Sequence, residues 1–185
     1  MTILSTEALS ARIFDAFSGV CLDGGVSLIE AEYIDRCEIT FTHLVTLEEK
    51  SDWTKLINNQ LCDYITTFCF TDYRVFRFYI VPYMIWTLRN FVDSSAFICD
   101  GTIDAIETNR CTFNEYFFSE VFSINQVKCM RNFLLFACEN GDHLDANVAR
   151  TNLTSTDAGL PRNPRDRTKR ARATPYQPPS FDDHP

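Results

Sequence analysis

An arginine and two tyrosines stand close together in the most apolar part of the chain. Arg77 lies between two phenylalanines, and Tyr79 and Tyr83 follow two and six positions later. A guanidinium beside phenolic hydroxyls can bind an anion or a carboxylate through a two-pronged contact. The structural alternative, which we favour, is an arginine with a buried stem and a paired charge at the entry to a core helix. Arg77, Tyr79 and Tyr83 are therefore predicted binding residues, with that alternative left open.

A second candidate site is a run of carboxylates and amides further along the chain. Its acidic members are Asp104, Glu107, Glu115 and Glu120. Their spacing differs from that of a calcium-binding loop, which needs ligands at its first, third, fifth and twelfth positions. We therefore predict no metal site and no cofactor, and we interpret the segment as a solvated acidic face. The same face would also suit a basic protein partner.

Motifs of the common enzyme classes are absent from the sequence. There is no G-x-S-x-G, no H-E-x-x-H and no glycine-rich phosphate loop, and the chain has only three histidines. Enzymatic chemistry would have to use carboxylates, tyrosines or a cysteine. Cys69 has Arg74 and Arg77 as neighbours in sequence, and these would lower its pKa, but we interpret it as a core residue. No catalytic residue is predicted.

The eight cysteines are scattered among apolar neighbours, and none forms a C-x-x-C pair. The first residues carry Glu7 and Arg12 and lack the apolar core of a secretion signal, which predicts a reducing, cytoplasmic location. We therefore expect free thiols that pack as small hydrophobic groups rather than disulfides.

The stretch Phe68–Phe91 is the most apolar and most aromatic part of the chain, and its charges and Pro82 interrupt it too often for a membrane span. Because proline suits the first turn of a helix, we predict a turn or short strand through 76–78 and then a buried central helix from about Tyr79 or Pro82 to about Asn90. The alternative is a helix capped by Thr71 or Asp72 and kinked by Pro82.

Capping boxes and apolar periodicity predict further helices around this one. The expected fold class is mainly α, a compact helical domain in which one or two short strands (39–42 and 96–99) are left open. The first predicted helix is Thr6–Gly19, and the second begins at the Ser27/Glu30 capping box. A third runs through Trp53 to Tyr64 and begins at the Thr46/Glu49 box or at a Ser51 or Asp52 cap. The last is Ile124–Asn140, between the Ser123/Gln126 box and Gly141.

Charge is unevenly distributed along the chain. Residues 1–150 hold 11 Lys and Arg against 21 Asp and Glu, whereas residues 151–185 hold 6 against 4. An acidic body argues against nucleic acid or an anionic membrane as its partner. We predict a globular domain over 1–141 and a disordered Pro/Arg-rich tail over 142–185, which could bind nucleic acid but is interpreted as solvated.

The run Phe76–Arg89, FRFYIVPYMIWTLR, resembles the core signature of a family of small acidic bacterial proteins of unknown function. The resemblance covers about residues 10–140 and excludes the tail. The family pattern has its proline one position earlier than Pro82, which leaves the start of the central helix open. The resemblance implies no catalytic residues, and by analogy of size and acidity it implies an immunity or interaction protein.

The sequence therefore favours a non-enzymatic protein-binding module, such as an immunity protein that neutralises a toxin or effector with a basic surface. The alternatives are an enzyme of unknown class and a nucleic-acid-associated protein that acts through its arginine-rich tail.

Overall fold

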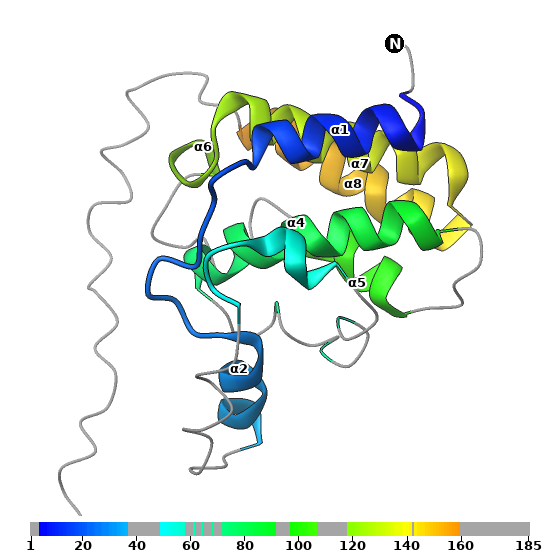
Figure 1. Ribbon diagram of the computed structural model, residues 1–185. Coiled ribbons are helices and arrows are strands. Elements are labelled where there is room, and N and C mark those ends of the chain that lie inside the picture. The colour runs from blue at the N-terminus through cyan, green and yellow to red at the C-terminus, as the bar shows by residue number, and fades with distance from the viewer. Residues whose placement is uncertain are drawn as a thin grey trace, which may run out of the picture.

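The computed structural model describes residues 4–36, 49–57, 61, 64, 68, 72–91, 97–106, 118–141 and 143–159. Within these ranges every regular element is helical, which confirms the predicted mainly α class (Figure 1). The elements are α1 (Thr6–Ala16), α2 (Leu28–Asp35), the 3₁₀ helix η1 (Trp53–Leu56), α4 (Tyr73–Asn90), α5 (Phe97–Ala105), α6 (Phe118–Val121), α7 (Ile124–Asn140) and α8 (His143–Gly159).

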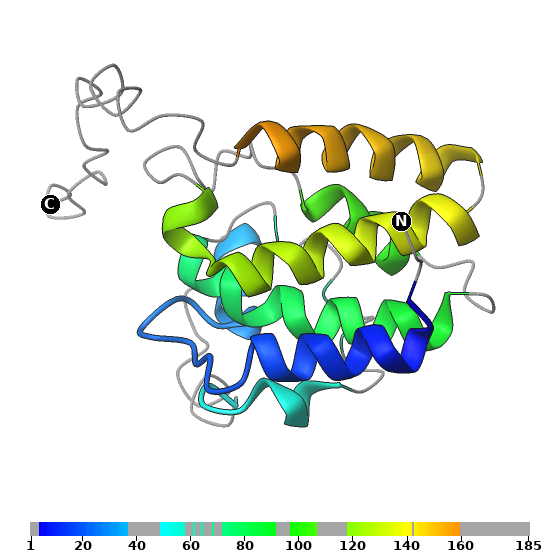
Figure 2. The ribbon, with the colours of Figure 1, turned by 90° about the horizontal axis from the view of Figure 1, so that it is seen from above.

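Five helices are joined in a closed ring of pairwise contacts. Helix α1 packs against α7, α7 against α8, α8 against α5, α5 against α4, and α4 against α1. Viewed from above, the axes of α1, α4, α7 and α8 are roughly parallel, and the chain runs along α1 and α8 in the direction opposite to that along α4 and α7 (Figure 2). Helix α4 also packs against η1. Its three neighbours α1, α5 and η1 together contribute to burying α4.

Helix α4 is that buried element, and it corrects the predicted start of the central helix. It begins at Tyr73 rather than at Tyr79 or Pro82, and residues 76–78 are helical rather than extended. The Asp72 side chain caps it by accepting hydrogen bonds from the N–H groups of Arg74 (2.8 Å) and Val75 (3.1 Å). The alternative, a capped helix with Pro82 inside it, is the one the structure adopts.

The balance of energies explains why α4 tolerates its proline. A proline inside a helix costs about 3 kcal/mol, through a lost hydrogen bond and a clash with the preceding turn. Full burial of a phenylalanine contributes roughly 1.5–3 kcal/mol, and the helix brings both Phe76 and Phe78 to complete burial. Phe76 also makes edge-on ring contacts with Phe68 (centroids 5.3 Å apart) and Phe122 (5.9 Å). Packing therefore outweighs the local propensity that placed the helix start later.

Two predicted capping boxes are confirmed. The Ser27 hydroxyl accepts from the Glu30 N–H and the Glu30 carboxylate accepts from the Ser27 N–H, both at 3.3 Å. Ser123 and Gln126 make the same reciprocal pair at 3.3 and 2.9 Å. Gly141 ends α7 as predicted, with its N–H donating to the Ala137 carbonyl at 2.8 Å. These local signals fix α2 and α7 because they depend on residues three or four positions apart.

The segment after α4 differs from its prediction. Residues 97–105 form the helix α5, whereas the sequence leaves a short strand open at residues 96–99. The Thr102 hydroxyl donates to the Ile98 carbonyl (2.6 Å) and lies 3.3 Å from the Thr87 hydroxyl of α4. This buried polar link and the apolar side chains around it hold α5 against α4, so the helix continues through Gly101.

The Trp53 segment is helical over a shorter length than predicted. It begins after Asp52, whose carboxylate accepts from the Thr54 N–H (3.1 Å), but it ends at Leu56 as a single 3₁₀ stretch. Trp53 is a core anchor, as predicted, because it is buried and its indole N–H donates to the Phe17 carbonyl at 2.9 Å.

The predicted domain boundary at residue 141 is too early. Helix α8 follows almost directly after α7 and packs against both α7 and α5. Its buried residues Ala146, Ala149 and Asn152 face the domain, and the Asn152 amide donates to the Ile103 carbonyl at 2.9 Å. The low apolar content of this segment was misleading, because alanines and an asparagine suffice for close packing between helices. The predicted tail from residue 160 onward and the strand left open at 39–42 lie outside the described residues.

Among the described cysteines, Cys99 and Cys129 are buried and Cys138 is half-buried, as expected for thiols that pack as small hydrophobic groups, whereas Cys21 is exposed. Burial is the main cause that raises the pKa of the Cys129 thiol. Cys69 lies outside the described residues. No helix in the described part of the chain has the length and apolar character needed to cross a membrane.

Candidate functional site

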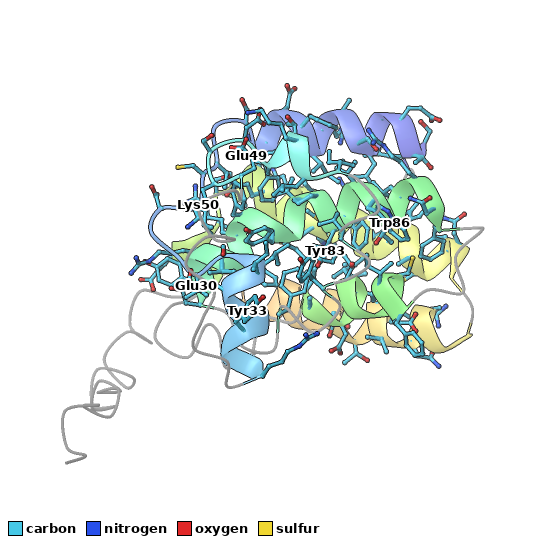
Figure 3. All side chains as sticks on the ribbon, turned by 60° about the horizontal axis from the view of Figure 1, so that its bottom comes forward. Glu30, Tyr33, Glu49, Lys50, Tyr83 and Trp86 are labelled. Atoms are coloured by element: carbon cyan, nitrogen blue, oxygen red, sulfur yellow. The ribbon has the colours of Figure 1, made fainter. Side chains whose placement is uncertain are left out.

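The two predicted binding tyrosines lie inside the protein, each with about 1% of its surface exposed. The Tyr79 hydroxyl accepts the Leu28 N–H at the start of α2 (3.3 Å). The Tyr83 hydroxyl donates to the Tyr64 carbonyl at 2.6 Å and lies 3.3 Å from the Leu61 carbonyl. Figure 3 shows Tyr83 and Trp86 on α4, in the middle of the molecule. Both hydroxyls therefore tie α4 to neighbouring backbone and are not presented to a ligand in solution.

Arg77 is not part of one fork with these tyrosines. Residues two and six positions apart in a helix lie about 200° and 240° apart around its axis, so Arg77 projects from another side of α4 than Tyr79 and Tyr83. Its side chain is half-buried, and its Nε is a buried donor without a hydrogen-bond partner, as is the indole nitrogen of Trp86. The structure thus separates the three residues that the sequence brought together.

The predicted acidic segment is divided between elements. Asp104 is exposed on α5 and Glu120 is exposed on α6, while Glu107 and Glu115 lie outside the described residues. Across the described ranges, no group of three or more His, Cys, Asp or Glu side chains is placed to hold a metal ion. Asp104 is therefore considered with its neighbours on α5 rather than with the other three.

The outward side of α5 carries an aromatic residue in line with two carboxylates. Phe97, Asp100 and Asp104 stand three and four positions apart, which places them within about 60° of one another around the helix. All three are exposed, Phe97 by 75%. The opposite side of the helix buries Ile98, Thr102 and Ile103 against the domain. We call the surface formed by Phe97, Asp100 and Asp104 the α5 face.

Helix electrostatics explain only one of the two carboxylates. Asp100 lies in the first turn of α5, where the helix dipole favours a negative charge by about 0.3–1 kcal/mol. Asp104 is the second-last residue of the helix, where the same dipole disfavours a negative charge. It also stands four positions from Asp100, and a like-charge pair at that spacing costs roughly 0.2–0.5 kcal/mol. The helix dipole and the Asp100 charge thus both disfavour a negative charge at Asp104.

Sequence reasoning found Asp104 but missed Phe97 and Asp100. The reason is that the sequence leaves a short strand open at residues 96–99, so the helix that aligns Phe97 with Asp100 and Asp104 was not expected. The signal was nevertheless present in the sequence. Phe97, Asp100 and Asp104 at i, i+3 and i+7 form one stripe, and Ile98, Thr102 and Ala105 form the opposite one.

A second polar cluster surrounds Glu49 and has a structural role. The Glu49 carboxylate accepts from the Ser51 N–H (2.9 Å) and hydroxyl (2.6 Å) and pairs with the Lys55 ammonium at 2.9 Å. These bonds, with that from the Ser51 hydroxyl the largest cause, lower the pKa of Glu49 to about 2. The Lys50 carbonyl next to it accepts the Leu22 N–H at 2.8 Å. The cluster therefore holds the start of η1 against the loop that follows α1.

Comparison with known proteins identifies a family. Residues 5–155 match the model of a family described as "Family of unknown function (DUF6714)", and because this match spans most of the chain, the protein belongs to that family. The matched range includes most of α8, in agreement with the packing of this helix as part of the domain. No curated protein and no solved structure matches the chain.

Proposed function

For this member of a family of unknown function, we propose a role as a non-enzymatic protein-binding module whose α5 face docks on a basic protein. The observation that supports this proposal is the alignment of an exposed aromatic side chain with two carboxylates on one helix face. A single exposed apolar residue is ordinary on a protein surface. An aromatic anchor flanked by charges of one sign is the arrangement that interfaces use for affinity and for orientation.

The two parts of the α5 face would contribute differently to binding. Phe97 is 75% exposed, and burial of a phenylalanine in a partner's pocket contributes roughly 1.5–3 kcal/mol. Asp100 and Asp104 would act mainly on the association rate and on the choice of partner, because exposed charges steer encounters and are screened by salt.

The net charge of residues 1–159 extends this attraction beyond one helix. Residues 1–159 hold 11 Lys and Arg against 22 Asp and Glu, a net charge of −11. A protein with this charge associates fastest with a basic partner. We propose more specifically an immunity-type protein, which occupies a basic toxin or effector and blocks it, with the α5 face as its contact surface.

The test is affinity capture from the native host with tagged full-length protein, followed by mass spectrometry and by titration with the purified partner. We expect a basic protein in near-stoichiometric amount, with affinity that falls as salt rises. Phe97→Ala should weaken binding at all salt concentrations, whereas Asp100→Asn with Asp104→Asn should weaken it mainly at low salt.

Matched controls separate the α5 face from general surface effects. Ile124→Ala removes another exposed apolar side chain, 56% exposed on α7. Asp15→Asn with Glu139→Gln removes the same charge from exposed sites on α1 and α7. Equal binding by the α5-face variants and by these controls would refute the proposed surface. The immunity role requires in addition that co-expression of this chain suppress the partner's toxicity, and persistent toxicity would exclude it.

A further inference from the structure

The chain continues beyond α8 with a segment whose charge is opposite to that of the folded part. The 26 residues after Gly159 hold 6 Lys and Arg against 3 Asp and Glu. All six cations fall within residues 162–172, which contain a single carboxylate, Asp166. We call residues 162–172 the basic segment. Its positive charge allows it to bind an acidic surface. Because it belongs to the same chain as the acidic residues 1–159, it is tethered to such a surface.

The end of α8 leaves the basic segment within reach of the α5 face. Helix α8 packs against α5, and Figure 2 shows the two helices next to each other. With 17 residues, α8 is about 25 Å long. An extended chain spans at most about 3.3–3.6 Å per residue, so Arg162 can lie about 10 Å and Arg172 about 45 Å from Gly159. That range is longer than α8 itself, so tether length does not prevent contact with any part of α5.

The basic segment and the α5 face have opposite charge, and their side chains are also of types that bind one another. Arginine can donate two parallel hydrogen bonds to a carboxylate, and its planar guanidinium packs on the face of an aromatic ring. The α5 face offers one exposed ring and two exposed carboxylates on a single side of a helix. Five of the six cations in the basic segment are arginines. A tether of this length also gives the segment an effective concentration of the order of millimolar.

We propose that the basic segment of this chain docks on the α5 face of the same molecule and competes there with the basic partner. The contact is autoinhibitory: the partner must displace the chain's own arginines, so only a protein with a stronger basic surface binds. A second copy of the chain is a poorer occupant, because two molecules of net charge −8 repel each other. The inference rests on the proposed function for the choice of surface but is tested without any partner.

The test uses Lys169, the only lysine in the basic segment, in the full-length protein. A zero-length carbodiimide reagent joins an amine to a carboxylate that touches it, and mass spectrometry identifies the two peptides. We expect Lys169 to be joined to Asp100 or Asp104 at low salt, and this product to be lost at high salt. It should also be lost in the Asp100→Asn/Asp104→Asn variant and greatly reduced in Phe97→Ala.

The controls address the position and the origin of the contact. Asp15→Asn with Glu139→Gln should leave the Lys169 product unchanged. A mixture of ¹⁵N-labelled and unlabelled protein should give products of uniform label, because both ends belong to one molecule. Mixed-label products would overturn the intramolecular contact in favour of a second copy. Absence of the product, or Lys169 joined equally to carboxylates all over the surface, would overturn the docking itself.

The two proposals fail separately in these experiments. A Lys169 product on α5 without any captured partner would support the docking and count against the proposed function. Partner binding that depends on the α5 face, without the Lys169 product, would support the function and refute the autoinhibition. If both hold, a full-length variant with the basic segment's arginines changed to glutamine should bind the partner more tightly than the parent protein.

Discussion

Replacement of Tyr83 by phenylalanine separates a structural role of the central helix from a binding role. The ring is fully buried and lies edge-on to Phe68 with centroids 5.0 Å apart, so phenylalanine preserves the packing. The substitution removes only the hydroxyl, which donates to the Tyr64 carbonyl at 2.6 Å and lies 3.3 Å from the Leu61 carbonyl. The Leu61 carbonyl keeps the Tyr64 N–H as a donor at 3.2 Å. The loss of stability therefore comes mainly from the bond to the Tyr64 carbonyl.

One hydrogen bond to a partly buried carbonyl sets the magnitude. An average hydrogen bond contributes a net of about 0.5–1.5 kcal/mol, and removal of the donor from a fully buried carbonyl costs about 1–3 kcal/mol. Because Leu61 retains a donor, we expect Tyr83→Phe to lower the free energy of unfolding by about 1–2 kcal/mol. For a chain of this size each kcal/mol lowers the melting temperature by roughly 2–4 °C. Urea unfolding followed by far-UV circular dichroism measures both the midpoint and the slope.

The control is Tyr73→Phe at the start of the same helix, where the side chain is half-buried and water can replace any bond that its hydroxyl makes. We expect this variant to lose less than half as much stability as Tyr83→Phe. Tyr83→Phe should bind the partner as the parent protein does, because its hydroxyl is inside. Unchanged stability together with lost partner binding would refute the structural role and restore Tyr83 as a binding residue.

Three further predictions concern local structure. Gly25→Ala should destabilise the protein by about 1–3 kcal/mol, because its new methyl group would lie 2.8 Å from the Val75 Cγ2 atom. Thermal unfolding measures the loss of stability. A neutral result would mean that the loop shifts freely and would contradict the prediction. Ser123→Ala should cost about 1 kcal/mol through loss of the α7 cap, and a double-mutant cycle with Gln126→Ala should show coupling, since the two side chains act reciprocally. Glu49 has a pKa lowered in the folded protein to about 2 from an ordinary 4.5; its contribution is thus complete above about pH 4.5 and lost as the pH falls toward 2. Glu49→Gln should remove that part of the acid dependence of unfolding, and identical pH profiles for the two proteins would contradict it.

The sequence by itself determined the features that depend on near neighbours. The caps at Ser27 and Ser123 follow from side chains three positions from the backbone groups they satisfy. The end of α7 at Gly141 follows from its backbone N–H, which donates to the Ala137 carbonyl four positions earlier. The helical class follows from apolar residues at helical spacing. Trp53 was correctly placed in the core, because a large aromatic residue within an apolar stripe has few other stable positions. Membership of an uncharacterised family was likewise expected, and a family model of unknown function covers residues 5–155.

Only the tertiary structure decided the features in which distant segments meet. Packing among the helices buries Phe76 and Phe78, and this burial outweighs the preference of Pro82 for a helix start. Because residues 76–83 are then helical, Arg77 lies on another side of α4 than Tyr79 and Tyr83. The apolar run predicted a buried helix, but local sequence does not show which distant segments cover it and therefore where it begins. Contacts with α7 and α5 likewise turn the weakly apolar residues 143–159 into part of the domain. The same packing makes residues 97–105 a helix, and by burying one side of it leaves Phe97, Asp100 and Asp104 together on the other.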